Sequence, residues 1–247
     1  MKFDVVTLFP GIIEGGCSES IVSRGIKAGI NTVATVNPRD FTKDKHRKTD
    51  DIPYGGGAGL VLSCQPFVDA VKSVDVLENS QTIILTPQGE RFSQSIAREF
   101  SKNNQLIIIC GHYEGFDERI RMLTKAREIS IGDFVLSGGE YAALCIIDAV
   151  SRLVPGVLGN EESAGNDSHE EYLLEYPQYT RPVNYEGLEV PEILLSGNHG
   201  EIAKWRRLKQ FERTQKKRPD MFEKFLNTEH SKEDKKLLKQ FFEGKDK

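Results

Sequence analysis

The chain has 247 residues, of which 38% are hydrophobic and 28% charged, and its formal net charge is −4. This length allows one large domain or two smaller ones, and no apolar run approaches the ~20 residues of a membrane span. The four cysteines lack the spacing of zinc or redox sites. We therefore expect reduced thiols in a cytoplasmic protein without a membrane-spanning segment.

The first 155 residues alternate strand-like and helix-like segments. Strands are expected at residues 3–8, 32–36, 82–85, 106–109 and 128–131. Helices are expected at residues 65–77, with Ser63 as N-cap, and at residues 93–100, 117–123 and 141–153. This alternation predicts an α/β fold with a mostly parallel sheet covered by helices.

Charge and polarity divide the rest of the chain. Residues 159–166 are polar and contain glycine, which predicts a flexible linker between a domain at 1–158 and a small helical domain at 167–247. Residues 201–247 hold 15 basic and 9 acidic side chains, and eight of the basic ones lie between 204 and 218. This pattern fits a polyanion partner, and it fits a solvated helix face equally well.

Three glycine-bearing loops each follow an apolar run: TPQGE at 86–90, CGHYEG at 110–115 and IGDFVLSGGE at 131–140. If the strands are parallel, their carboxyl ends meet at the sheet edge where open α/β proteins bind ligands. One such loop would be an ordinary βα turn. Three within 55 residues predict a pocket in which glycine lets the backbone approach a ligand closely.

Several common motifs are absent from the sequence. Neither GxGxxG after the first strand nor GxxxxGK[ST] occurs, which disfavours dinucleotide-binding and P-loop folds. HExxH and GxSxG are also missing, and the five histidines lack metal-ligand spacing. A neutral or cationic adenosine-like ligand suits these loops better than a polyphosphate. No metal ligands are identifiable, and the participation of a divalent ion such as Mg²⁺ stays open.

Seven motifs together resemble one family, the bacterial tRNA (guanine-N1)-methyltransferases of the knotted SPOUT class. They are GGGAG at 55–59, LTPQG at 85–89, CGHYEGFDER at 110–119, SIGDFVLSGGE at 130–140, RLVPGVLG at 152–159, YTRP at 179–182 and IAKWR at 202–206. The resemblance covers nearly the whole chain. It implies transfer of a methyl group from S-adenosylmethionine to N1 of the guanosine immediately 3′ of the anticodon in tRNA. It also implies a trefoil knot in the C-terminal part of the catalytic domain.

The resemblance assigns Asp167 as the base that deprotonates N1 and Arg152 as the group that stabilises charge at O6. An Asx turn would equally explain Asp167, and the helix dipole would explain Arg152. One departure is His169, where the family usually has phenylalanine, and it affects the expected local packing. The family also implies a homodimer with a composite active site, in which Asp167 of one subunit serves the pocket of the other.

The resemblance also implies two sets of binding residues. The cofactor set is Leu85, Thr86, Pro87, Gly89, Gly111, Tyr113, Glu114, Ser130, Ile131, Gly132, Asp133, Phe134, Val135, Leu136, Gly138 and Gly139. The tRNA set is Lys204, Arg206, Arg207, Arg213, Lys216 and Lys217. Glu114 has an alternative role as an ion-pair partner of Arg119 or Arg121. The basic stretch at 39–48 is either a loop that contacts tRNA phosphates or a solvated loop.

Two competing interpretations remain. One is a nonenzymatic RNA-binding module with a vestigial pocket. The other is a knotted methyltransferase of related fold that acts on a ribose 2′-hydroxyl or on ribosomal RNA.

Overall fold

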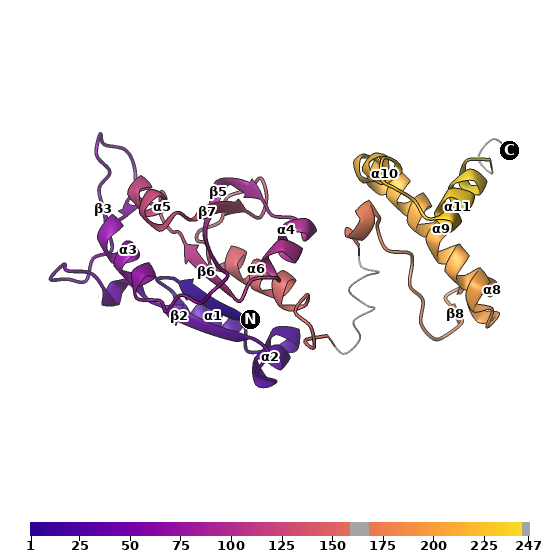
Figure 1. Cartoon of the computed structure of the whole chain (residues 1–247), viewed down its shortest axis with the longest axis horizontal. Coiled ribbons are helices and arrows are strands. Elements are labelled where there is room, and N and C mark those ends of the chain that lie inside the picture. The colour runs from indigo at the N-terminus through magenta and orange to yellow at the C-terminus, as the bar shows by residue number, and fades with distance from the viewer. Residues whose placement is uncertain (159–167, 244–247) are drawn as a thin grey trace. The chain divides into compact units, whose positions relative to one another are not determined.

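The strand β6 (Gln105–Cys110) lies at the centre of a five-stranded sheet in which every pairing is parallel (Figure 1). The strand order is β2-β1-β6-β5-β7. The other strands are β1 (Lys2–Val6), β2 (Thr32–Val36), β5 (Ser80–Arg91) and β7 (Arg127–Ser130). The predicted α/β fold with a parallel sheet is therefore confirmed.

The structure is a computed structural model that describes residues 1–158 and 168–243. The chain forms two units, Met1–Glu161 and Glu162–Lys247. Within the described residues, no helix is both long enough and apolar enough to cross a membrane.

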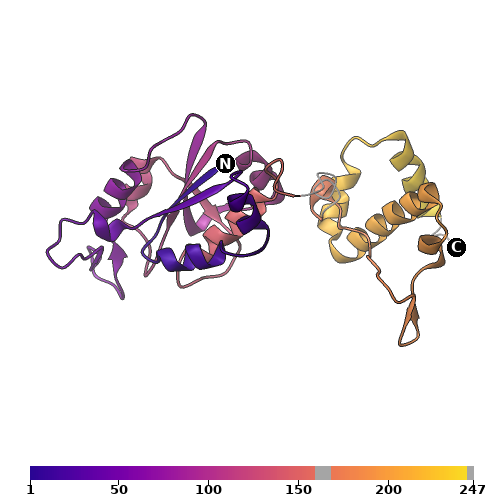
Figure 2. The same ribbon diagram turned by 90° about the horizontal axis from the view of Figure 1, so that it is seen from below.

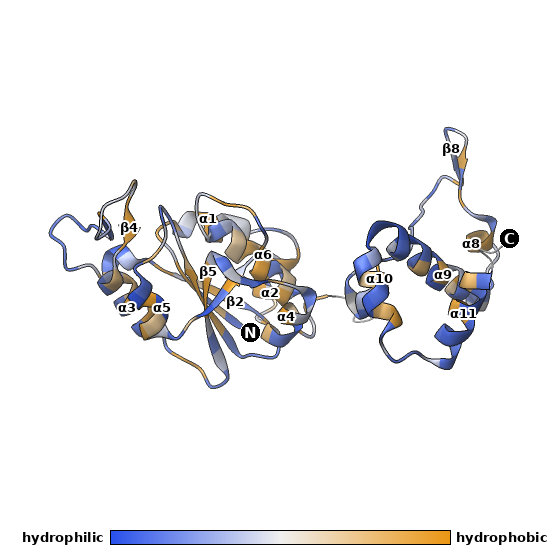
Figure 3. Cartoon of the chain, turned by 90° about the horizontal axis from the view of Figure 1, so that it is seen from above, coloured by the Kyte–Doolittle hydropathy of each residue, from blue (hydrophilic) through white to orange (hydrophobic). Residues whose placement is uncertain are grey.

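Alternate residues of β6 pack into two hydrophobic cores, one on each face of the sheet. Leu106 and Ile108 face the core that is covered by α1 (Pro10–Gly16), α2 (Ser20–Lys27), α4 (Gln94–Phe100) and α6 (Glu140–Ser151). Ile107 and Ile109 face the core that is covered by α3 (Cys64–Lys72) and α5 (Glu118–Thr124). Figure 2 shows the sheet between these two groups of helices. In Figure 3 the hydrophobic colour is concentrated on the strands and on the neighbouring helices. Such burial on both faces explains the continuous apolar run of a parallel strand.

The helices differ from the sequence prediction mainly at α3 and in the segment before β2. Helix α3 ends at Lys72 rather than Leu77, and Ser63 occupies its N-cap position without a side-chain capping bond. Helices α1 and α2 were not predicted; in α1 the proline and glycines of Pro10–Gly16 resemble turn signals. Gly16 permits close packing there, since a Cβ at this position would lie 2.5 Å from the side chain of Leu144 on α6.

The segment between β2 and α3 contains only short elements: the 3₁₀ turn η1 (Pro38–Asp40) and the antiparallel pair β3 (Asp50–Asp51) and β4 (Val61–Leu62). Its basic loop is held by internal contacts. Arg47 forms an ion pair with Asp40 and donates to the carbonyl of Arg39. The loop is therefore ordered by its own side chains, and its tRNA contact stays a prediction.

The second unit consists mainly of helices. Its elements are η2 (Glu170–Tyr172), β8 (Asn184–Tyr185), β9 (Leu188–Glu189), α8 (Glu192–Leu195), α9 (His199–Lys217), α10 (Pro219–Leu226) and α11 (Lys232–Glu243). Its core joins Leu173 to the rings of Phe211, Phe222 and Phe225 and to leucines of α11. Leu173 thereby fixes the segment that follows residue 167 to the helices of this unit.

Candidate active site

A pocket of about 410 Å³ lies at the carboxyl ends of β6 and β7 and beside residues 84–88 of β5. The three glycine-bearing loops form its wall, and fourteen members of the predicted cofactor set line it: Leu85, Thr86, Pro87, Gly111, Tyr113, Glu114, Ser130, Ile131, Gly132, Phe134, Val135, Leu136, Gly138 and Gly139. The volume lies within the range of small-molecule sites. The structure therefore brings together residues that are up to 54 positions apart in the sequence.

Gly89 and Asp133 are outside the wall of this pocket. A Cβ at Gly89 would lie 2.5 Å from the backbone nitrogen of Ile129, so glycine is needed here for close backbone packing. The exposed carboxylate of Asp133 lies 3.8 Å from Arg91. The cofactor role assigned to these two residues stays a prediction.

The first loop is part of a strand rather than a turn between strand and helix. Both Leu85 and Glu90 of β5 pair with Ile129 of β7, so residues 86–89 form an irregularity within the strand. Thr86, Pro87 and Gln88 of this segment line the pocket. Interruption of a ladder is a common way to aim residues at a site.

The second and third loops are held together by their backbones. The amide of Gly139 donates to the carbonyl of Gly111 at 2.8 Å. A Cβ at Gly139 would lie 2.9 Å from Cα of Cys110, so a larger residue would separate the loops. Within the third loop, Ser130 Oγ both donates to the carbonyl and accepts from the amide of Gly132.

A buried carboxylate lies beneath these loops, and sequence reasoning did not predict it. Glu140, the first residue of α6, is only 1% exposed. Thr7 Oγ1 donates to its Oε1 at 2.5 Å, and its Oε2 lies 2.8 Å from His112 Nε2. Burial, followed by the charge of Glu140, raises the pKa of the neighbouring Cys110 thiol well above its ordinary value. Cys110 is therefore an unreactive packing residue.

Glu114 lines the pocket without an ion pair among the described residues. Arg119 pairs with Asp117, and Arg121 pairs with Glu118, so neither arginine takes the partner role that was considered for Glu114. The backbone amide of Glu114 donates to the carbonyl of Leu60. The GGGAG loop also approaches this side chain, since a Cβ at Gly59 would lie 2.5 Å from it.

Of the two predicted catalytic residues, the structure describes one. Arg152 is the C-cap residue of α6 and is half-buried. Asp167 lies outside the described residues.

The six predicted tRNA-binding residues lie on α9, where most have partners within the unit. Lys204 pairs with Glu201 at 2.5 Å, Arg206 lies over the ring of Tyr176 at 4.8 Å, and Arg213 donates to the carbonyl of Glu175. Lys216 and Lys217 are exposed in the last turn.

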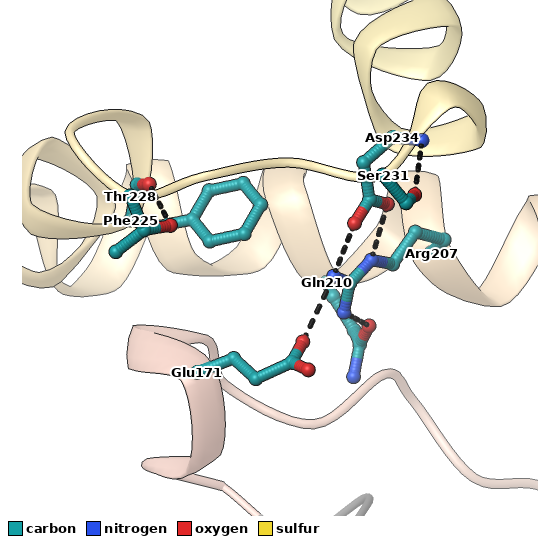
Figure 4. Close-up of polar contacts among 7 residues, drawn as sticks. All are labelled: Glu171, Arg207, Gln210, Phe225, Thr228, Ser231 and Asp234. Carbon is teal, nitrogen blue, oxygen red and sulfur yellow. Dashed lines mark hydrogen bonds and ion pairs between the residues drawn. The ribbon is translucent and has the colours of Figure 1, made fainter.

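Arg207 has several partners within the unit, and its side chain is 22% exposed. Its guanidinium bonds to Asp234, Glu171 and Gln210 (Figure 4). Arg207 therefore contributes to the packing of the unit, and its contact with tRNA stays a prediction.

Across residues 1–158 and 168–243, no group of three or more His, Cys, Asp or Glu could hold a metal ion.

Comparison with known proteins shows which family this chain resembles. The family model of the tRNA (guanine-1)-methyltransferases matches residues 1–224. Three relatives bear the name tRNA (guanine-N(1)-)-methyltransferase. The one from Geobacter sp. (strain M21) is 53% identical over 239 residues, 96% of this chain and 95% of the relative. The one from Citrifermentans bemidjiense is 54% identical over 239 residues, with the same coverage. The one from Dehalococcoides mccartyi (strain ATCC BAA-2266) is 52% identical over 242 residues, 96% of each chain.

Proposed function

This chain belongs to the tRNA (guanine-1)-methyltransferase family, and we propose that it methylates N1 of the guanosine immediately 3′ of the anticodon with S-adenosylmethionine as donor. The observation that carries this proposal is the convergence of three loops on one pocket at the sheet edge. Ligands bind at this edge in open α/β folds. A tRNA substrate would place the protein in the cytoplasm.

The pocket suits S-adenosylmethionine in its size and in its lining. Tyr113, Phe134 and Leu136 line it and are 49%, 54% and 40% exposed, so apolar surface is available to cover an adenine ring. Backbone groups of Ile131 and Gly132 would read the polar edge of that ring. When bound, this cofactor supplies an electrophilic methyl group.

Two side chains of the protein would make guanine N1 reactive. N1 carries a proton at neutral pH, so a base must remove it while a cation or donor stabilises the charge that develops at O6. We assign these tasks to Asp167 and Arg152, respectively. Arg152 is the C-cap of α6, the helix that begins directly after the third loop of the pocket. Alignment of the reacting atoms would then supply much of the rate.

A homodimer would complete this site. Val135 beside the pocket is 84% exposed and Tyr141 on α6 is 60% exposed, so large apolar side chains are free for a second copy to cover. We propose that Asp167 of one subunit serves the pocket of the other, and that the catalytic domain carries the trefoil knot.

Residues 167–247, with Lys216 and Lys217 exposed on α9, would bind tRNA phosphates.

Methyl transfer to matched transcripts tests the target. An unmodified tRNA transcript and a copy with adenosine in place of the guanosine 3′ of the anticodon are each incubated with the protein and labelled S-adenosylmethionine. Label is expected only in the first transcript. Equal label in both would contradict the proposed position, and label in neither would favour a nonenzymatic RNA-binding protein.

A further inference from the structure

Three side chains from distant parts of the chain form a hydrogen-bonded row beneath the pocket. Thr7 follows β1, His112 follows β6, and Glu140 begins α6. Thr7 Oγ1 accepts from the amide of Phe9 at 2.9 Å and donates to Glu140 Oε1 at 2.5 Å. Glu140 Oε2 lies 2.8 Å from His112 Nε2. Because Thr7 is fully buried and Glu140 is 1% exposed, this row is held out of water.

The contact with Glu140 determines which ring nitrogen of His112 carries the hydrogen. An ionised carboxylate only accepts hydrogen bonds, and the first turn of α6 is a favourable place for a negative charge. Glu140 Oε2 therefore accepts from His112 Nε2–H. In a neutral imidazole the other nitrogen, Nδ1, is then an acceptor. Among the described residues, Nδ1 has no hydrogen-bond partner.

His112 is also part of the pocket wall. It lies between Gly111 and Tyr113, and its side chain is 16% exposed. Its ring packs against Phe9 with the centroids 4.6 Å apart. It also lies against the third loop, where a Cβ at Gly138 would be 2.1 Å from Nε2. The ring is therefore held between fixed neighbours at the surface of the site.

We propose that His112 is a cofactor-binding residue whose Nδ1 accepts a hydrogen bond from an N–H or O–H group of the bound cofactor. Glu140 is a positioning residue that acts through His112, because it holds hydrogen on Nε2 and leaves Nδ1 as the acceptor. This inference rests on one part of the proposed function, namely that S-adenosylmethionine binds in the pocket. It does not depend on which atom of the RNA receives the methyl group.

Two substitutions of His112 separate this role from a simple clamp between loops. The amide of glutamine can reach as far as Nε2, so His112→Gln keeps a donor for Glu140 and loses the acceptor at Nδ1. Asparagine is shorter, so His112→Asn places an amide oxygen near the position of Nδ1 and loses the contact with Glu140. If Nδ1 binds the cofactor, asparagine retains more affinity than glutamine. A clamp predicts the reverse order.

Calorimetry with S-adenosylmethionine measures the dissociation constant of each variant, and thermal unfolding checks that each is folded. We expect His112→Gln to bind about tenfold more weakly than wild type, as for the loss of one hydrogen bond of about 1.4 kcal/mol. His112→Asn should fall between the two. The exposed substitution Glu19→Gln is the matched control and should leave the affinity unchanged.

A double-mutant cycle tests the part played by Glu140. A glutamine there would accept from Thr7 but donate to Nε2, which moves the hydrogen of His112 to Nδ1. Glu140→Gln should therefore weaken cofactor binding about fivefold alone and cause no further loss in the His112→Asn background.

Wild-type affinity in His112→Gln, or fully additive losses in the cycle, would overturn the proposal. Failure of the wild-type protein to bind S-adenosylmethionine would overturn it together with the proposed cofactor, whereas methylation of a different RNA atom would leave it standing.

Discussion

The guanidinium of Arg207 on α9 forms a two-pronged ion pair with Asp234 on α11, with both nitrogen–oxygen distances at 2.8 Å (Figure 4). The same group reaches Glu171 at 3.0 Å and lies over the rings of Phe211 and Phe225. Burial disfavours the charge of Arg207, but its hydrogen bond with Asp234 keeps its pKa above the ordinary value. Arg207 thus connects two helices and the segment that follows residue 167.

Replacement of Arg207 should destabilise the second unit. Arg207→Ala leaves the largely buried carboxylate of Asp234 without its partner, and we expect a loss of about 2 to 3 kcal/mol in the free energy of unfolding. Lys204→Ala, which removes an exposed pair with Glu201, should cost about 0.5 kcal/mol or less. Denaturant unfolding of both variants checks this. Equal effects would show that the network around Arg207 adds no stability.

The exposed lysines at the end of α9 should behave in the opposite way. Lys216→Glu with Lys217→Glu should weaken tRNA binding and leave thermal unfolding unchanged, because neither side chain is buried. The loss should be greater at low salt than at high salt, since phosphate contacts release counterions. Filter binding over a range of salt concentrations measures this. A loss that does not depend on salt would contradict phosphate contacts at these two residues.

The Arg218–Asp220 pair gives a dependence of stability on pH. The hydrogen bond from Arg218 lowers the pKa of Asp220 to about 2, below the value of about 3.9 for an unfolded chain. Stability from this pair is therefore present above pH ~3.9 and is lost as the pH falls through about 2. Titration of the Asp220 carboxyl by NMR should show the low value, and Arg218→Ala should raise it. An unchanged titration in that variant would rule out Arg218 as the cause.

The proposed composite site predicts that two inactive proteins restore activity together. Asp167→Ala lacks the base, and Gly132→Trp blocks the pocket, where even a Cβ would lie 2.6 Å from the ring of Phe134. After random exchange about half the dimers are mixed and half their sites are intact, so roughly a quarter of wild-type activity should return. Methyl transfer by the refolded mixture measures this. Mixtures that stay inactive despite proven exchange would place the whole site within one chain.

The parts of the fold that could be predicted depend on local patterns. The apolar run at residues 106–109 predicted a strand because β6 is buried on both faces. The irregularity in β5 could not be predicted, because it arises from the pairing of both Leu85 and Glu90 with Ile129, about forty residues away. The residues TPQGE are compatible both with a turn after a strand and with an irregularity within a strand.

The candidate site shows the same limit. Its loops could be predicted from glycines after apolar runs, and the family resemblance supplied individual roles. The contact of Thr7 with Glu140 spans 133 positions, so no local pattern could indicate it. In the sequence, Arg207 is one of several basic residues in the predicted tRNA set. Only its contacts with Asp234 and Glu171 show that it contributes to the packing of the second unit.

The identity of the methylated nucleoside tests the central claim most directly. Unmodified tRNA is incubated with the protein and S-adenosylmethionine, digested to nucleosides and separated by chromatography with mass detection. We predict N1-methylguanosine as the new product, and its absence after incubation with Asp167→Ala. A 2′-O-methyl nucleoside would instead indicate a knotted methyltransferase that acts on ribose, and would contradict the assignment of Asp167 and Arg152 to guanine N1 and O6.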